Sequence, residues 1–134
     1  MFIYKKKINF FDCDPAGILF YARVYELCHS AYEALIESFS LIEDYWKNET
    51  YIVPIISSEA SYLKPVKYGE EILVEVKVSQ LKQSSFELQY DCKNGKGESC
   101  AKVTTVHVFV DKSSWAKTEM NKEIKKFFEK YMGT

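Results

Sequence analysis

The sequence predicts an α+β domain in which one long amphipathic helix packs against an antiparallel sheet. Apolar residues within 24–35 recur with the period of an α-helix. Apolar and polar residues then alternate through 72–78 and again through 86–92, as they do in half-buried strands. The Asn94-Gly95 pair that follows is a frequent hairpin turn, so these strands are expected to pair with antiparallel neighbours.

The first part of the chain predicts a short strand, an irregular turn and the long helix. Residues 2–9 are expected to form the strand and residues 12–17 the turn, because Pro15 and Gly17 both oppose a regular element. The helix is expected to run for about five turns, with charged residues such as Glu33 on its exposed face. Its buried face is expected to consist of Val24, Leu27, Cys28, Ala31 and Leu35.

The rest of the chain predicts further strands and a second helix. The apolar run 51–56 is expected to form an edge strand or an irregular one, because it contains Pro54. A long last strand is expected to reach Val110, with a bulge or a bend near residues 104–105, where its apolar phase slips. An apolar stripe over 120–131 predicts a short C-terminal helix.

The composition predicts a single domain over residues 1–134. Hydrophobic residues make up 47% of the chain, enough for a packed core, and neither a linker nor an internal repeat divides it. One helix cannot cover both faces of a sheet, so the second face must be solvated or used in assembly. Aromatic residues make up 16% of the chain, and this content favours assembly.

Charge and cysteine content bear on partners and location. The net charge of -1 gives no electrostatic footprint for nucleic acid or an anionic membrane, and no apolar run is long enough to span a bilayer. The four cysteines lack metal-binding spacing and only two histidines accompany them, so no metal site is expected. The N-terminal residues do not resemble a signal peptide, and unpaired thiols fit a reducing cytoplasm.

Residues 8–21 have the sequence Ile-Asn-Phe-Phe-Asp-Cys-Asp-Pro-Ala-Gly-Ile-Leu-Phe-Tyr, which resembles the signature of the 4-hydroxybenzoyl-CoA thioesterase family. The resemblance continues through 54–62 and 84–86 and covers most of the chain. It implies the hotdog fold, an antiparallel sheet wrapped around a long central helix. It also implies hydrolysis of acyl-CoA without a cofactor, since coenzyme A is part of the substrate.

The resemblance implies that Asp14 is the catalytic carboxylate, which attacks the thioester carbonyl or activates a water. It also implies that the backbone N–H of Tyr21 polarises that carbonyl at the start of the helix. The first N–H groups of a helix have no internal partner and carry partial positive charge, so both roles are physically reasonable. Taken alone, an Asp before Pro is more often a turn or capping residue. Asp12 is expected to fix the loop by accepting backbone hydrogen bonds.

Gly17, Phe20 and His29 are expected to line the substrate pocket. His29 lies about two helical turns after Tyr21, where the family usually carries an acidic residue. Two interpretations of His29 remain open: it contacts the substrate or orients a water, or it is a helix histidine that binds a neighbouring side chain.

Lys82 and Ser85 are the candidates for binding coenzyme A. They match the family's surface loop that meets the nucleotide phosphates, although the paired arginines of the closest relatives are missing here. Lys64 and Lys67 are second candidates. Cys13 lies between two acids that would raise the pKa of its thiol, so a thiolate nucleophile is not expected there.

The function predicted from the sequence is hydrolysis of an aryl or a short- to medium-chain acyl-CoA. Two alternatives remain: a non-catalytic protein that binds acyl thioesters, and a hotdog dehydratase or hydratase. Dehydratases pair a histidine with an acid in a different loop, and no such histidine precedes the helix here. Members of the family form dimers that often pair into tetramers, so a homo-oligomer is expected. The acyl carrier could be coenzyme A or a carrier protein.

Overall fold

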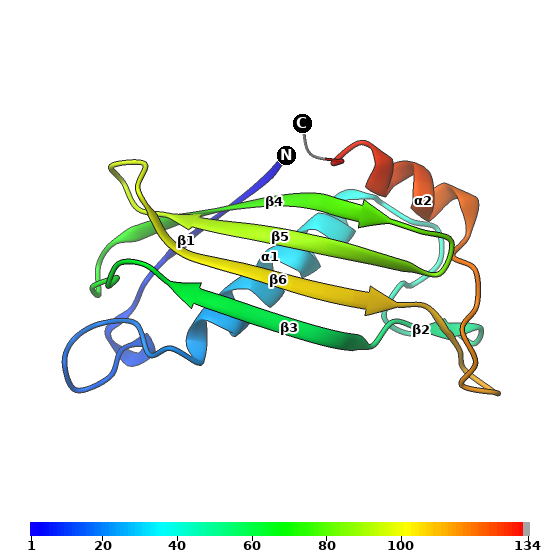
Figure 1. The fold of residues 1–134 in the computed structure, drawn as a ribbon, viewed down its shortest axis with the longest axis horizontal. Helices are drawn as coiled ribbons and strands as arrows, with labels where there is room; N and C mark the ends of the chain where they lie inside the picture. Colours follow the sequence, from blue (N-terminus) through cyan, green and yellow to red (C-terminus); the bar gives the residue numbers. More distant parts are fainter. Residues whose placement is uncertain (133–134) are drawn as a thin grey trace.

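The computed structural model describes residues 1–132 and contains a sheet with a long helix across one face (Figure 1). The order of elements confirms the predicted α+β class. Along the chain they are β1 (Phe2–Lys7), the 3-10 turn η1 (Phe10–Asp12), α1 (Arg23–Ser38), β2 (Tyr51–Ile52), β3 (Ile55–Tyr62), β4 (Glu71–Leu81), β5 (Ser85–Lys93), β6 (Ser99–Val108), β7 (Val110–Asp111) and α2 (Lys122–Glu129).

The five long strands form one sheet in the order β1-β4-β5-β6-β3, and every neighbouring pair is antiparallel. β2 and β7 form a separate two-stranded ribbon. Figure 1 shows α1 lying behind the central strands of the sheet. The core fills the space between α1 and the inner face of the sheet, to which β4 contributes the fully buried residues Ile72, Val74, Val76 and Val78.

α1 buries the apolar stripe that its sequence predicts. All five residues expected on its inner face are buried, and so are Tyr32 and Ile36. The helix has 16 residues, which is about four and a half turns. It ends before Ser40, whose φ of 51° lies in the left-handed region that often terminates helices. The predicted C-terminal helix is also present as α2, whose Phe128 ring stacks on Phe86 at 4.2 Å.

Two irregularities predicted in the strands have different outcomes. Pro54 does interrupt the run 51–56, which forms β2 and β3 on either side of it. Of the bulge or bend expected near Thr104 and Thr105, the bulge is wrong, because β6 pairs with both neighbours in unbroken register at these residues. The apolar phase slips there because two polar residues, Thr105 and His107, occupy the inner face.

The sheet face turned away from α1 is polar along the central strands, and its use in assembly stays a prediction. Charged residues alternate with the buried ones along the central strands, and Lys93 pairs with Glu75 at 3.0 Å. Exposed apolar residues instead gather along β3, the edge strand, and the segment after it: Ile55, Ile56, Tyr62 and Leu63.

Candidate active site

A loop between β1 and α1 presents Asp14 next to the start of the helix. Within the turn, Gly17 N donates to the Asp14 carbonyl oxygen at 2.9 Å. Gly17 has a φ of +80°, which L side chains rarely adopt, so glycine allows the chain to turn back here. Residues Cys13 and Leu19 then pair across the loop as an isolated antiparallel bridge.

Two carboxylates of the loop, Asp12 and Asp14, accept backbone hydrogen bonds that fix its conformation. Asp12 Oδ2 accepts a hydrogen bond from Asn9 N at 2.9 Å, which confirms the loop-fixing role predicted for Asp12. Asp14 Oδ1 accepts from Ala16 N at 2.9 Å. Within residues 1–132, no protein group donates to Asp14 Oδ2. One oxygen therefore fixes the carboxylate, and the other is available for chemistry.

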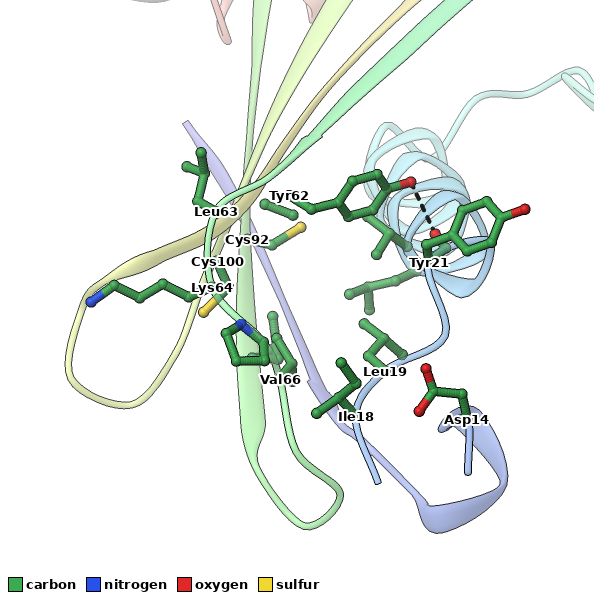
Figure 2. A pocket seen from close by; sticks show the side chains of 15 residues that line it. Asp14, Ile18, Leu19, Tyr21, Tyr62, Leu63, Lys64, Val66, Cys92 and Cys100 are labelled. Carbon is green, nitrogen blue, oxygen red and sulfur yellow. Dashed lines mark hydrogen bonds between the residues drawn. The ribbon is translucent and has the colours of Figure 1, made fainter. Parts of the chain in front are cut away.

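Asp14 lies on the wall of a cavity of about 350 Å³. The cavity is bounded by the loop, the first turns of α1 and one end of the sheet (Figure 2). Figure 2 shows Asp14 on the loop side, with Cys92 and Cys100 on the sheet side. Its volume is at the lower end of the range for small-molecule sites. The cavity can hold an acyl group whose reacting carbonyl lies close to the carboxylate.

The start of α1 offers unpaired donors beside this cavity. The residue before the helix, Ala22, provides no side-chain cap. Within the described part of the chain, neither the Tyr21 nor the Ala22 backbone N–H donates to a protein acceptor. Tyr21 also lines the cavity. An uncapped helix start next to a carboxylate is suited to stabilising a negatively charged oxygen.

Tyr62 connects the end of β3 to this helix start. Its hydroxyl donates to the Tyr21 carbonyl oxygen at 3.1 Å, and the two rings meet edge to face at 6.3 Å (Figure 2). Burial is the main factor that raises the pKa of Tyr62, so the phenol keeps its proton. The hydrogen bond therefore ties the helix start to the sheet edge.

Three thiols lie in or behind the cavity wall. Cys92 and Cys100 line the cavity, and Cys92 Sγ lies 3.8 Å from Cys28 Sγ on α1. Burial raises the pKa of Cys100, and contact with Cys92 together with burial raises that of Cys28. The pKa of Cys13 is raised by burial first and then by Asp12 and Asp14, as predicted. These pKa shifts favour neutral thiols.

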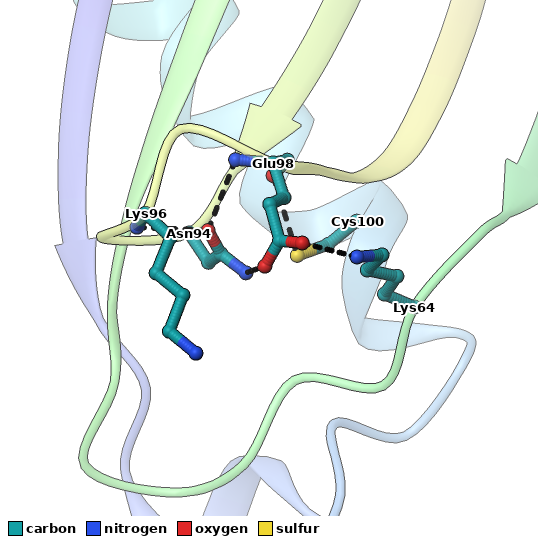
Figure 3. A network of polar contacts seen from close by, with 5 residues as sticks. All are labelled: Lys64, Asn94, Lys96, Glu98 and Cys100. Carbon is teal, nitrogen blue, oxygen red and sulfur yellow. Dashed lines mark hydrogen bonds and ion pairs between the residues drawn. The ribbon is translucent and has the colours of Figure 1, made fainter.

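The rim of the cavity holds an ion pair. The Lys64 ammonium pairs with Glu98 Oε2, and Asn94 Nδ2 donates to Glu98 Oε1 at 3.1 Å (Figure 3). The hydrogen bond from Lys64 is the main cause that lowers the pKa of Glu98. This network connects the segment after β3 to the β5–β6 turn.

The three predicted pocket residues do not line this cavity: Gly17 and Phe20 precede the helix start, and His29 lies about two turns into α1. Gly17 shapes the turn, and the Phe20 ring packs against Tyr21 at 4.9 Å while 42% exposed. His29 Nδ1 lies 2.9 Å from Glu33 Oε2, and its ring contacts Trp46. In a single chain, His29 is thus a helix histidine that binds a neighbour.

Lys82 and Ser85 lie in the β4–β5 turn, at the opposite end of the sheet from the cavity. Ile72 lines the cavity near the start of β4, and the strand ends at Leu81. At the usual rise per residue this is a separation of about 30 Å. The two residues therefore do not meet the cavity of their own chain, whereas Lys64 does.

Sequence reasoning missed the residues that reach the cavity from distant strands, above all Tyr62 and Cys92. Alternation along β3 could have placed Tyr62 on the inner face with Ala60, since Ala60 pairs with the buried Val103. No comparable signal connects Cys92 to Asp14, because they become neighbours only through the packing of α1 on the sheet.

Residues 1–132 contain no helix with the length and apolar character needed to cross a membrane. Nor do they group three or more His, Cys, Asp or Glu side chains in a way that could hold a metal ion.

The fold and the site define a hotdog domain built around a carboxylate and a helix start. The chain belongs to the Thioesterase-like superfamily, whose family model matches residues 8–128. This membership confirms the family resemblance and the fold predicted from the sequence, and it identifies the protein as a thioester hydrolase.

Two relatives carry the name of an acyl-CoA hydrolase. A 1,4-dihydroxy-2-naphthoyl-CoA hydrolase of Nostoc punctiforme is 31% identical over 129 residues, covering 96% of this chain and 86% of that protein. A hydrolase of the same name from Gloeothece citriformis is 31% identical over 114 residues, covering 83% of this chain and 80% of that protein.

Solved structures share the fold at lower identity. A 1,4-dihydroxy-2-naphthoyl-CoA thioesterase from Synechocystis superposes with a TM-score of 0.88 at 20% identity, covering 95% of this chain and 94% of that one. A Staphylococcus aureus protein in complex with CoA gives a TM-score of 0.90 at 11% identity, covering 99% of this chain and 86% of that one.

Proposed function

We propose that the protein hydrolyses the thioester of an aryl or a short- to medium-chain acyl-CoA, with Asp14 as nucleophile or general base. The observation that carries this proposal is that Asp14 and the uncapped start of α1 at Tyr21 line one cavity. The relatives named as acyl-CoA hydrolases support coenzyme A as the carrier.

In the proposed reaction the thioester oxygen lies against the Tyr21 N–H, where negative charge develops as the carbonyl is attacked. Asp14 either attacks the carbonyl carbon, giving a mixed anhydride that water then hydrolyses, or removes a proton from the attacking water. Either way the C–S bond breaks, water supplies the hydroxyl of the released acid, and the thiolate of coenzyme A takes up a proton. Asp14 Oδ2 suits this role because it is free of protein donors within residues 1–132.

For coenzyme A we propose that Lys82 and Ser85 act from a second copy of the chain. In such a dimer, β3 of one copy would pair antiparallel with β3 of the other, so the two sheets would run in opposite directions. The β4–β5 turn of the partner would then lie at the same end of the combined sheet as this chain's cavity. Lys64 is a further candidate at the rim, because its ammonium is half exposed and could exchange Glu98 for a phosphate.

The same arrangement supports the proposal of a homo-oligomer, either a dimer or a tetramer of such dimers. β3 has one free edge and carries the exposed Ile55 and Ile56. In the oligomer Gly17 and Phe20, which precede the helix start, and His29, about two turns into α1, remain candidates for contacts with the substrate. The free thiols of Cys13, Cys28, Cys92 and Cys100 support the further proposal of a reducing, cytoplasmic location.

A thiol-release assay on a panel of acyl-CoAs tests the proposal. Asp14→Asn removes the charge of the carboxylate with little change of shape, so kcat is expected to fall by at least about a thousandfold. Binding of acyl-CoA should be retained. Glu37→Gln is the matched control: it makes the same change at an exposed position near the end of α1 and should keep full activity.

Two results would contradict the proposal. If Asp14→Asn kept the activity, the carboxylate would not take part in the reaction. If the unmodified protein bound acyl-CoA tightly but released no thiol, a non-catalytic acyl-thioester binder would be the better description. Hydration or dehydration of an enoyl thioester without thiol release would indicate the dehydratase or hydratase alternative.

A further inference from the structure

The turn after β7 presents a tryptophan in a strained backbone conformation. Trp115 has a φ of 62°, in the left-handed region that a bulky side chain rarely adopts. Hydrogen bonds fix the turn: Trp115 N donates to the Asp111 carbonyl oxygen, and Asp111 N donates to the Ala116 carbonyl oxygen, both at 2.8 Å. The Trp115 side chain is 66% exposed, so burial within the chain does not offset the strain. A rigidly held, exposed indole is suited to contact with a second surface.

This turn lies beyond the start of β3. β2 directly precedes β3, and Ile52 of β2 pairs with Val110 of β7. Val108 N also donates to the Pro54 carbonyl oxygen at 3.1 Å. Figure 1 shows the turn, in orange, projecting at this end of the sheet on the side where β3 forms the edge. Trp115 is therefore placed outside one end of the free edge.

The other end of β3 carries a patch of exposed apolar side chains at the opening of the cavity, called the mouth patch below. It consists of Phe20, Tyr21, Tyr62 and Leu63, all of which are exposed. The Tyr21 ring contacts the ring of Phe20 at 4.9 Å and that of Tyr62 at 6.3 Å, so the patch is continuous. Tyr21, Tyr62 and Leu63 also line the cavity.

Antiparallel pairing of β3 between two copies would bring the turn and the mouth patch together. A two-fold axis through the middle of β3 sets Ile55, its first residue, opposite Tyr62, its last, in the other copy. The turn after β7 of one copy then lies beside the mouth patch of the other. Because the symmetry is two-fold, the contact forms twice, once at each end of the paired strands.

The middle of β3 contributes little apolar area to such an interface. Its eight residues include Ser57, Ser58 and Ser61. A stable interface buries about 800 Å² on each partner, and one large aromatic side chain buries about 150–250 Å². Large side chains at the two ends of β3 therefore supply area that its serine-rich middle does not.

From this geometry we infer that Trp115 of one copy packs on the mouth patch of a second copy and completes the rim of that copy's cavity. The inference rests on the oligomer in the proposed function, and it names a residue through which each subunit reaches the site of the other. It accounts for a bulky residue at a backbone position that glycine or asparagine adopts with less strain. The indole also adds an apolar surface for a substrate that enters the cavity.

Sedimentation velocity over a range of protein concentrations tests the contact. Trp115→Asn removes the ring but suits the left-handed conformation, so circular dichroism should show an intact fold while the dissociation constant rises on the order of 10- to 100-fold. Trp115→Phe keeps an aromatic ring and should retain most of the affinity. Ile42→Asn, a matched change at an exposed apolar residue outside β3 and this turn, should leave association unchanged. An unchanged dissociation constant in Trp115→Asn would overturn the inference.

Two further measurements identify the surface that Trp115 contacts. The chain has two tryptophans, so Trp46→Phe leaves Trp115 as the single reporter, and its emission should move to shorter wavelength as the copies associate. In a double-mutant cycle, Trp115→Asn and Leu63→Ala should together weaken association by at least about twofold less than the product of their single effects. Constant emission, or independent effects in the cycle, would overturn packing on the mouth patch.

Steady-state kinetics tests completion of the rim. At concentrations that keep Trp115→Asn associated, KM for an acyl-CoA should rise by about 2- to 10-fold, because one aromatic contact at the opening is lost. The value of kcat should change little, since Trp115 does not reach the reacting atoms. An unchanged KM would overturn the role at the rim.

Association is measured without catalysis, so the inference and the proposed hydrolysis can fail separately. If Ile56→Asp dissociates the protein and Trp115→Asn does not, pairing through β3 stands and the inference is overturned. A protein that stays monomeric at every concentration would overturn both the oligomer and the inference, while thiol release still decides hydrolysis. Weaker association and a higher KM in Trp115→Asn together would support the inference.

Discussion

At the scale of single residues, the Tyr62 hydroxyl links the sheet edge to the helix start beside the cavity. It donates a hydrogen bond to the Tyr21 carbonyl oxygen at 3.1 Å, and Tyr62 is the last residue of the edge strand β3. The carbonyl it holds belongs to the same residue whose N–H is proposed to bind the substrate oxygen. We therefore expect Tyr62 to be a positioning residue, which acts on the substrate through Tyr21.

Tyr62→Phe is expected to lower kcat by about 2- to 10-fold, the equivalent of one hydrogen bond worth roughly 0.5–1.5 kcal/mol. KM should change little, because the ring still lines the cavity. Steady-state kinetics with one acyl-CoA measures this split between kcat and KM. Tyr68→Phe is the matched control, since Tyr68 is 58% exposed and stacks on Phe10. An equal fall of kcat in the control, or a change confined to KM, would contradict the positioning role.

The identity of the catalytic carboxylate could be proposed from the sequence, because Asp14 lies within a specific local motif. The apolar stripe of α1 also predicted which helix residues are buried. The role of Tyr62 could not be predicted, because its partner Tyr21 is 41 residues away and the contact depends on how the sheet edge meets the helix. His29 was predicted as a pocket residue or a satisfied histidine, and its contact with Glu33 supports the second interpretation within one chain.

At the scale of elements, the inner face of β5 and β6 contains a buried polar chain. Tyr90 shares a hydrogen bond of 2.9 Å with Thr105, and Thr105 shares one of 2.7 Å with His107 Nε2. The His107 ring stacks on Phe86 at 4.5 Å and is fully buried. Within residues 1–132, His107 Nδ1 has no hydrogen-bond partner.

Burial, with a smaller contribution from His29, lowers the pKa of His107 to about 3. The unfolded chain, in which a histidine titrates near 6.5, therefore binds a proton that the folded protein excludes. The free energy of unfolding should fall as pH drops from about 6.5 towards 3, by about 2 kcal/mol between pH 7 and pH 5. Urea unfolding at both pH values measures this loss.

His107→Asn provides the control for this prediction, because asparagine does not titrate and should remove that part of the pH dependence. The variant is expected to be less stable at pH 7, since it disturbs the contacts with Thr105 and Phe86. A slope between pH 7 and pH 5 equal to that of the unmodified protein would contradict the assignment to His107.

At the scale of the whole molecule, the free edge of β3 is the surface that the proposed oligomer requires. Among residues 1–132, β3 pairs with β6 alone, and its free edge and the segment beyond it expose Ile56 (62%) and Leu63 (53%). An exposed edge of this kind is a template for pairing with another strand. The sheet face turned away from α1 is instead polar and carries the ion pair between Lys93 and Glu75.

Ile56→Asp should reduce self-association, because it places a charge on the strand that is proposed to pair. Sedimentation velocity over a range of protein concentrations measures the shift towards the monomer, which is expected to be at least about tenfold in the dissociation constant. Ile42→Asp is the matched control, since Ile42 is 97% exposed and lies outside β3. Unchanged association in Ile56→Asp would indicate that a different surface mediates assembly.

The sequence alone determined the class of fold, the buried stripe of α1 and the position of Asp14. Each of these depends on residues close together in the chain, through a period of about 3.6 or 2 residues or through a local motif. Tertiary structure alone decided the rest of the site: the cavity wall with Cys92 and Ala101, the Tyr62 contact and the separation of Lys82 from the cavity. These features depend on strand order and on the packing of α1 against the sheet, which join residues that no local pattern connects.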